Sequence, residues 1–370
     1  MSKAPLSAQS TETRYKEKEK VLYAGFNQDM SCISLGTDQC FKIFQVQPFK
    51  LCFSYPGGMS CVQMLYTTSL LGLVGAGQQA QMSPRRLQLF NTSESKVICE
   101  LNFVTNILNV LMSKKRLVVV LEKKIHLFDI SNMKILSTIE TEKNPKGLCT
   151  LASKIVKRKN EQGEEEEDEE PSYIAYPIGP ESNQIMVCNA KNANRVDVAI
   201  KAHKAAISAL QFNSDGSLLA TASNKGTVIR IFSVPDFELL YTLRRGSYAA
   251  SIYSISFNAS STMVCVSSDT GTIHIYKLEG RHKNKGNVGT LTDTVMNMWD
   301  SVRDFAHAKI KNVGPTKCGI NANGDALTVV GYDGLVHRFS LDSANGGECK
   351  LEQTENLLEA TATAAPNEEQ

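Results

Sequence analysis

Short apolar runs separated by polar turns repeat along this chain of 370 residues. Four segments, beginning at Phe26, Phe212, Phe257 and Ile320, share one order: an apolar run, a turn rich in Asn, Asp, Gly or Ser, a second run, a second turn and a third run. Runs rich in Val, Ile, Leu and Phe between such turns are typical of β-strands joined by hairpins. The pattern therefore predicts a repeated β-unit.

The spacing of the copies predicts their number. Asn213 and Asn258, at matching places in two copies, are 45 residues apart, which is close to the about 40–45 residues of a four-stranded propeller blade. The 186 residues from Asn27 to Asn213 hold four such steps, so three weaker copies should lie between them. The 63 residues from Asn258 to Asn321 exceed one step and predict an insertion. The candidates for the weaker copies are 69–91, 116–130 and 172–190.

These copies add up to a closed, all-β, seven-bladed β-propeller of the WD40-like kind, because a ring of blades leaves no long sheet edge exposed. We predict this one domain over 20–355, with disordered tails at 1–19 and 356–370 that hold too few apolar residues to fold. The Trp-Asp dipeptide that often ends a third strand is missing. We expect aromatic residues at that place to fill the core between blades: Phe44, Phe90, Phe128, Phe232, Tyr276 and Phe339.

The formal net charge of +2 conceals an uneven distribution. Residues 161–170 contain eight acidic and no basic residues, so the rest of the chain has 40 basic against 38 − 8 = 30 acidic residues, a surplus of 10. That surplus indicates an anionic partner, with phospholipid headgroups and nucleic acid as the leading candidates and an ordinary basic surface as the alternative. We expect the acidic insertion over 157–171 to have too few apolar residues to order itself.

Several protein classes are disfavoured. No window of roughly 18 apolar residues occurs and no apolar stretch follows the N-terminal charges, so we expect a cytoplasmic protein without a membrane span or secretory signal. The ten cysteines form no C-x-x-C pair, which favours buried reduced thiols over a metal site. Because the common phosphate-loop, metalloprotease and nucleophile-elbow motifs are missing, we expect neither an enzyme nor a cofactor. Nucleic-acid binding is disfavoured because the single Trp leaves basic residues without interleaved aromatics.

Arg244 and Arg245 end a predicted strand and are followed by Gly246. Successive strand residues point to opposite faces, so one guanidinium should serve the fifth blade and the other the sixth, while Gly246 lets the backbone turn close to both. A guanidinium offers paired donors that match two phosphate oxygens, which predicts two anion sites; a solvated pair before a turn is the alternative. Polar residues of the same types accompany the pair at matching places in the two blades: His203, Ser223, Thr227 and Arg230, and then Ser268, Thr272 and His274. Individually they also suit turn caps and a structural histidine.

These residues resemble the PROPPIN family, the WD-repeat propellers of autophagy that bind phosphoinositides. The resemblance spans residues 20–342 and rests on LRRG at 243–246, NPKGLC at 144–149, AHK at 202–204 and SSDTGTIHIY at 267–276. It implies rim sites for phosphatidylinositol 3-phosphate and phosphatidylinositol 3,5-bisphosphate, on a monomeric adaptor that associates peripherally with autophagosome-precursor, endosomal or vacuolar membranes and recruits autophagy machinery. Leu243 departs from the Phe common at that place. The implied first site is His203, Ser223, Thr227, Arg230 and Arg244, and the second is Arg245, Ser251, Ser268, Thr272 and His274.

The predicted blade-six insertion, over 280–311, starts basic and becomes amphipathic. Its apolar positions follow a +4, +3, +4, +3 spacing, which predicts one stripe of a helix, with the only Trp beside it. Such a helix suits a membrane interface, and the resemblance implies this role. The alternative is a helix folded back on the propeller, because Asp293, Asp300 and Asp304 on its polar face would be repelled by an anionic membrane. The predicted membrane-inserting residues are Leu291, Val295, Met298, Trp299, Val302 and Phe305.

Pro84 and Arg85 lie in a loop that enters a late strand of blade two. The resemblance implies that this loop contacts the lipid-transfer scaffold protein of autophagy, whereas a proline-stiffened, solvated hairpin is the alternative. For the whole chain, the competing hypothesis is a general protein-interaction WD-repeat scaffold without specific lipid binding.

Overall fold

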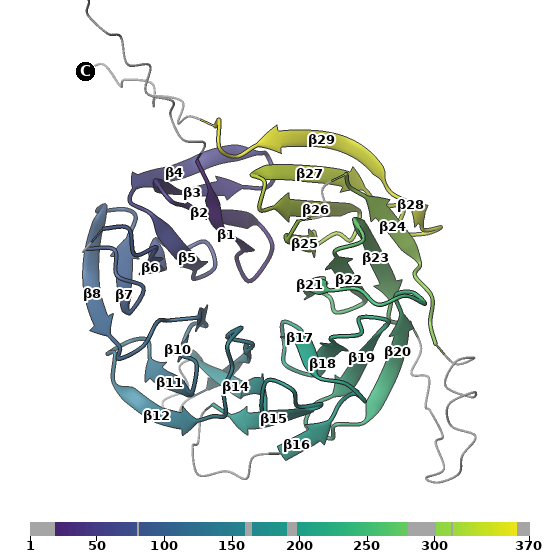
Figure 1. Cartoon of the computed structure of the whole chain (residues 1–370), viewed down its shortest axis with the longest axis horizontal. Helices are drawn as coiled ribbons and strands as arrows, with labels where there is room; N and C mark the ends of the chain where they lie inside the picture. The colour runs from purple at the N-terminus through teal and green to yellow at the C-terminus, as the bar shows by residue number, and fades with distance from the viewer. Residues whose placement is uncertain are drawn as a thin grey trace, which may run out of the picture.

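The computed structural model describes residues 19–79, 81–159, 165–190, 198–279, 301–311 and 314–360, with the backbone alone over 153–171. Every regular element in these ranges is a β-strand, and no helix there is long and apolar enough to cross a membrane. The strands form seven sheets arranged around a central axis, and all their pairings but one are antiparallel (Figure 1). The prediction of a seven-bladed propeller is therefore confirmed.

The strands follow the chain from the centre of each blade to its rim. Blades one to four contain β1 (Val21–Phe26), β2 (Cys32–Thr37), β3 (Cys40–Gln45) and β4 (Lys50–Pro56); β5 (Met59–Met64), β6 (Leu70–Gly75), β7 (Arg86–Asn91) and β8 (Lys96–Asn102); β9 (Asn109–Met112), β10 (Arg116–Val120), β11 (Lys124–Asp129) and β12 (Ile135–Glu140); and β13 (Thr150–Lys159), β14 (Glu165–Pro177), β15 (Gln184–Asn189) and β16 (Val198–Lys201).

Blades five to seven contain β17 (Ile207–Phe212), β18 (Leu218–Ser223), β19 (Val228–Ser233) and β20 (Leu239–Arg244); β21 (Ile252–Phe257), β22 (Met263–Ser268), β23 (Thr272–Lys277) and β24 (Ala306–Lys309); and β25 (Thr316–Ile320), β26 (Ala326–Gly331), β27 (Leu335–Ser340) and β29 (Lys350–Asn356). A short strand from blade seven, β28 (Gly347–Glu348), joins β24 in parallel. The three weaker sequence copies coincide with second and third strands of blades two to four.

Burial follows the position of a strand within its blade. The second strands β2, β22 and β26 are buried along their whole length, whereas the outermost strand β4 alternates between exposed and half-buried residues. Both faces of a second strand are covered because each blade packs between two others. The aromatic residues predicted to fill this core are all buried: Phe44, Phe90, Phe128, Phe232, Tyr276 and Phe339.

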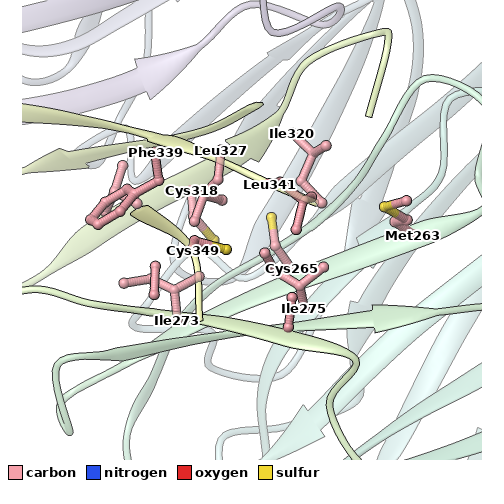
Figure 2. Packing of buried hydrophobic residues seen from close by; sticks show 13 residues of the cluster. Met263, Cys265, Ile273, Ile275, Cys318, Ile320, Leu327, Phe339, Leu341 and Cys349 are labelled. Atoms are coloured by element: carbon pink, nitrogen blue, oxygen red, sulfur yellow. The ribbon is translucent and has the colours of Figure 1, made fainter. Parts of the chain in front are cut away.

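The core between blades six and seven illustrates this packing. Figure 2 shows Cys265 and Ile275 from blade six facing Cys318, Leu327 and Phe339 from blade seven, all of them buried. All ten cysteines lie in the described ranges, none is part of a disulfide, and seven are buried. The expectation of buried thiols therefore holds for most of them.

Among the described strands, blades one and seven share none, so the ring closes without strand exchange between them. Blade one uses β1 to β4 and blade seven uses β25, β26, β27 and β29, so side chains form the joint. Leu357 is fully buried in this joint, and the Lys42 ammonium donates hydrogen bonds to the carbonyls of Leu357 (3.2 Å), Leu358 (2.7 Å) and Ala360 (3.3 Å). The expected start of the tail at 356 is therefore wrong, because residues up to 360 complete the ring.

The acidic run of blade four has a regular backbone. Residues 165–170 belong to β14 and pair with β13, so that the positions of Lys157 and Arg158 lie opposite those of Glu167 and Glu166. The expectation that this run cannot order itself is wrong for residues 165–170, while residues 161–164 lie outside the described residues. The expectation of disorder was based on apolar content alone, whereas opposite charges at paired positions also favour strand pairing.

Candidate functional site at the rim of blades five and six

Strand β20 carries the arginine pair to the boundary between blades five and six. The half-buried Arg244 donates from Nη2 to Ser247 Oγ (3.1 Å), while Arg245, only 8% exposed, donates from Nε to the carbonyl of Gly226 (2.7 Å) and from Nη2 to the carbonyl of Tyr248. The two side chains have no partner in common, as their alternation along the strand predicts. Arg245 thus lies against the blade-five turn, although it belongs to the predicted second site, on blade six.

The turn between β18 and β19 lies very close to the loop that follows the arginines. The Arg245 N–H donates to the carbonyl of Thr227 (2.9 Å), and the Ala250 N–H donates to the carbonyl of Lys225 (3.1 Å). Gly226, with φ of 58°, lies at the point of close approach. A glycine is needed there because a Cβ would lie 1.9 Å from the Ala250 carbonyl oxygen. Gly246 has no such constraint: its φ is ordinary and a Cβ would meet nothing within 4 Å. The close approach expected at Gly246 therefore occurs at Gly226.

A buried polar cluster lies beneath this turn. His203 Nε2 lies 2.9 Å from Thr221 Oγ1, and Arg230 Nη1 donates to the carbonyl of Ala202 (2.8 Å). Burial, together with the Arg230 charge, lowers the pKa of His203 to about 4, so this imidazole is neutral at pH 7. Burial also lowers the pKa of Arg230. The structural hydrogen bond that was the alternative role for His203 is thus present.

Arg230 has a donor that the described protein does not satisfy. Its Nε is buried without a hydrogen-bond partner, and within the described ranges none of Arg230, Arg244 and Arg245 is paired with a carboxylate. A buried donor left without a partner costs about 1–3 kcal/mol. An anion reaching this side chain would supply both the acceptor and the counter-charge.

The remaining residues of the predicted first site lie at the same turn. Ser223 ends β18, is buried, and accepts the Gly226 N–H (2.8 Å) at its carbonyl. Thr227 is half-buried, and its carbonyl accepts the N–H groups of Arg245 and Gly246. The fold thus brings Ser223 and Thr227 to one turn together with the arginine predicted for the second site.

Blade six repeats this arrangement. Arg230 is paired in register with Thr221, two residues before Ser223, and His274 is paired with Val266, two residues before Ser268. Arg230 and His274 therefore occupy equivalent places, as the sequence pattern indicates.

The hydroxyl and imidazole groups of blade six have near partners. Ser268 Oγ lies 2.9 Å from Thr270 Oγ1, and the carbonyl of the exposed Ser251 accepts the Asp269 N–H (3.1 Å). His274 Nδ1 lies 3.0 Å from Asp304 Oδ2. Thr272 pairs with Lys309 across β23 and β24. Unlike blade five, this site already contains a carboxylate next to its imidazole.

Four of the six predicted membrane-inserting residues lie outside the described residues: Leu291, Val295, Met298 and Trp299. The other two lie on the propeller. Val302 accepts the Arg244 N–H (2.8 Å), donates to the Thr242 carbonyl (2.9 Å) and bridges in parallel to Leu243, while Phe305 packs against the core between blades six and seven.

The continuation of the helical stripe through Val302 and Phe305 is therefore wrong. Val302 forms a β-bridge instead, because β20 has an open outer edge that the returning chain fills, and Phe305 lies in a bend directly before β24. The insertion also ends earlier than the predicted 311, since β24 begins at Ala306.

Pro84 and Arg85 precede β7, as expected. The carbonyl of Pro84 accepts the Ile107 N–H (2.9 Å) and that of Arg85 accepts the Phe103 N–H (2.9 Å). The loop is thus fixed to the connection between blades two and three, on the rim away from β20 (Figure 1).

The fold and this rim define a class of protein: a seven-bladed propeller with paired arginines at one blade boundary and polar residues in equivalent register on both sides of it. The sequence model of the PROPPIN family matches residues 21–358, and the chain belongs to that family. Among curated relatives, Autophagy-related protein 18 of Dictyostelium discoideum is 40% identical, covering 93% of this chain and 95% of the relative. Autophagy-related protein 18 of Yarrowia lipolytica is 37% identical, covering 92% and 97%.

Solved structures show the same architecture. KlAtg21, solved in a complex with the coiled coil of AgAtg16, has a TM-score of 0.72 and 26% identity, covering 91% of this chain and 99% of that one. Hsv2 of Kluyveromyces lactis, at 21% identity, has a TM-score of 0.73, covering 92% and 100%, and supports the fold alone. The relatives support a role in autophagy.

Three contributors to this rim were not identified from the sequence. Thr221 and Asp304 are the partners of the two predicted histidines, and Gly226 lets the turn approach the arginine loop. The available signal was a glycine three residues after Ser223 and Ser268, which marks a turn in each blade but does not show what packs against it.

Proposed function

We propose that this protein is a phosphoinositide-binding adaptor that docks on membranes containing phosphatidylinositol 3-phosphate or phosphatidylinositol 3,5-bisphosphate and recruits autophagy machinery. The observation that carries the proposal is a set of three arginines at one blade boundary without a carboxylate partner in the described ranges, one of them with an unsatisfied buried Nε. Guanidinium groups beside hydroxyls suit a phosphorylated inositol ring, which presents several acceptor oxygens.

The two sites would act together. Arg230 and Arg244 with Ser223 and Thr227 belong to blade five, and the hydroxyls of blade six lie one blade further along the same rim. Each contact with a membrane raises the effective concentration of the other. Because the charges lie at the rim and not on the flat face of the ring, the propeller would bind a membrane edge-on.

The test is flotation of the protein with phosphatidylcholine vesicles that contain or lack phosphatidylinositol 3-phosphate, at two salt concentrations. We expect lipid-dependent flotation that weakens with salt and is lost in Arg244→Thr/Arg245→Thr. Arg85→Thr is the matched control, because it removes an exposed arginine on blade two. Equal flotation of the folded double variant, or no flotation of the wild type, would reject the lipid hypothesis in favour of a protein scaffold.

A second surface favours a protein partner. The outermost strands of blades two and three, β8 and β12, and the connection after β8 expose several large apolar side chains, and exposed apolar surface of this kind marks interaction sites. Pro84 and Arg85 adjoin it through their hydrogen bonds to that connection. The exposed residues are Val97, Ile98, Val104, Leu108, Ile135 and Leu136.

We therefore propose that this rim recruits autophagy proteins, either a lipid-transfer scaffold or a coiled coil such as the one solved with KlAtg21. Val104→Glu combined with Ile135→Glu should abolish co-precipitation of such a partner. Vesicle flotation should be unchanged, because the arginine rim is on other blades. Loss of both activities would indicate misfolding, and retention of the partner would exclude this surface.

A further inference from the structure

Tyr248 stands out in the loop that follows the arginine pair. Its side chain is 87% exposed, and among the described residues of blades five and six it is the only large apolar or aromatic side chain exposed to this degree.

The loop that carries Tyr248 is firmly held. Arg245 donates to the Tyr248 carbonyl, and the N–H groups on either side, of Gly246 and Ala250, donate to the carbonyls of Thr227 (3.3 Å) and Lys225 (3.1 Å). The main chain is therefore fixed against the β18–β19 turn while the ring projects into solvent. An exposed ring on a fixed loop loses little conformational entropy when it is buried in a ligand or membrane.

Basic residues lie on the segments that hold the Tyr248 loop. Arg244 contacts Ser247, next to Tyr248, and the exposed Lys225 lies on the turn to which the loop is bound. Arg303, also exposed, follows Val302, whose carbonyl binds the Arg244 N–H. An exposed aromatic ring with a hydroxyl, on a loop bound to segments that carry cations, suits the headgroup layer of an anionic membrane, where rings sit at the boundary and cations meet phosphates.

A protein partner fits this site less well. Binding hot spots lie within a continuous patch that excludes water around the anchor residue. No other exposed large apolar side chain in the described part of blades five and six adjoins Tyr248.

We infer that Tyr248 is an interfacial membrane anchor, which enters the headgroup region of the bilayer whose phosphoinositides occupy the arginine sites. This inference rests on the proposed function and adds to it a residue that contacts the bilayer itself. Substituting Tyr248 should therefore weaken binding to a membrane without changing the affinity for a headgroup in solution.

The first experiment compares these two affinities. In Tyr248→Ala, binding to vesicles with phosphatidylinositol 3-phosphate should weaken by about five- to tenfold, as expected for loss of part of a buried aromatic surface. Binding of inositol 1,3-bisphosphate, the water-soluble headgroup, should be unchanged, because Arg245 bonds the backbone of residue 248. Arg244→Thr/Arg245→Thr should lose both. Tyr248→Phe should retain most of the vesicle affinity.

The second experiment uses the single Trp of the chain. In Trp299→Phe/Tyr248→Trp, the only tryptophan occupies the loop, and its emission should shift to the blue and be quenched by brominated lipids when vesicles are added. The matched control is Trp299→Phe/Val104→Trp, since Val104 is 88% exposed on the rim of blades two and three. That tryptophan should stay in water.

The outcomes separate the two proposals. Unchanged vesicle binding in Tyr248→Ala, or a loop tryptophan that stays in water on bound vesicles, overturns the anchor while the arginine variants still support lipid binding. Equal weakening of headgroup and vesicle binding also overturns it, because Tyr248 would then only shape the arginine site. If the wild type binds neither probe, the proposed function and the anchor both fail.

Discussion

Arg230 and His203 share one buried cluster, and only one of them carries a charge at pH 7. Burial and the Arg230 charge together lower the pKa of His203 to about 4, so the imidazole acts as a neutral hydrogen-bonding group toward Thr221. The charge for an anion must then come from the arginines. A protonated His203 would be a second cation in this buried site next to Arg230, so we expect its protonation to destabilise the fold and not to aid anion binding.

The histidine predicts how stability depends on pH. Its pKa is about 4 in the folded state against a reference value of 6.5, so the unfolded state binds the extra proton in that window. The stabilisation is fully present above pH 6.5 and is lost as the pH falls to about 4. Between pH 7.5 and 5 we expect His203 to account for a loss of about 2 kcal/mol in the free energy of unfolding. Urea unfolding at both pH values measures it, and an equal loss in His203→Gln would refute the assignment.

The two glycines near the arginines predict opposite results for the same substitution. Gly226→Ala should destabilise the fold by about 1–3 kcal/mol, because φ is positive and the Cβ would meet the Ala250 carbonyl. It should also reduce vesicle binding, since the loop carrying the arginines must move. Gly246→Ala should leave both unchanged. Thermal unfolding and flotation of the pair test this, and a stable, fully binding Gly226→Ala would show that the turn can move at little cost.

At the scale of elements, the outer edge of β20 connects the blade-six insertion to the arginine pair. The chain leaves β23 with the Leu278 N–H bonded to the Thr262 carbonyl (2.8 Å), and it returns at Val302 on β20 before forming β24. β24 then lies between β23 and β28. Both ends of the insertion are therefore fixed by contacts of the propeller itself.

This arrangement predicts that the insertion is dispensable for folding. Replacing 281–299 by a Gly-Ser linker of equal length should change the free energy of unfolding by less than about 0.5 kcal/mol. Vesicle binding should fall by about tenfold or more if the segment inserts into membranes, as its amphipathic sequence predicts. Circular dichroism, urea unfolding and flotation provide the readouts. Undiminished flotation would remove the insertion from the binding mechanism.

For the molecule as a whole, the ring depends on a joint made by side chains. Because no described strand is shared between blades one and seven, a buried apolar cluster that includes Leu357, together with the three carbonyls bound by Lys42, holds the two blades together. A propeller that opens at this joint would lose the packing of both terminal blades.

Truncation can test the joint. Removing 361–370 should leave the melting temperature unchanged, whereas removing 357–370 should lower the stability by about 2–5 kcal/mol, since a fully buried Leu and several hydrogen bonds are lost. Lys42→Met should cause part of the same loss. If both truncations melted at the wild-type temperature, closure would have to rest on the strands alone.

Much of the fold could be predicted from the sequence, because each blade repeats a local pattern of strands and turns. The repeat spacing identified the number of blades, and the aromatic residues at the ends of third strands were placed correctly in the core. The arginine pair and the matching Ser, Thr, Arg and His positions were found because strand alternation and register are local properties. The acidic hairpin and the end of the propeller were missed, since pairing partners and a closing contact lie outside any local window.

Sequence alone thus determined the blade count, the strand order within each blade and the types of side chain at the rim, since all three depend on residues near one another in the chain. Tertiary structure decided that Arg245 lies against blade five, that the close approach of the turns occurs at Gly226, that Val302 and Phe305 dock on the propeller, and that Tyr248 projects from the loop after the arginines. Each of these depends on how closely separate turns approach one another in space. That distance is determined by the packing of neighbouring blades, which no local pattern encodes.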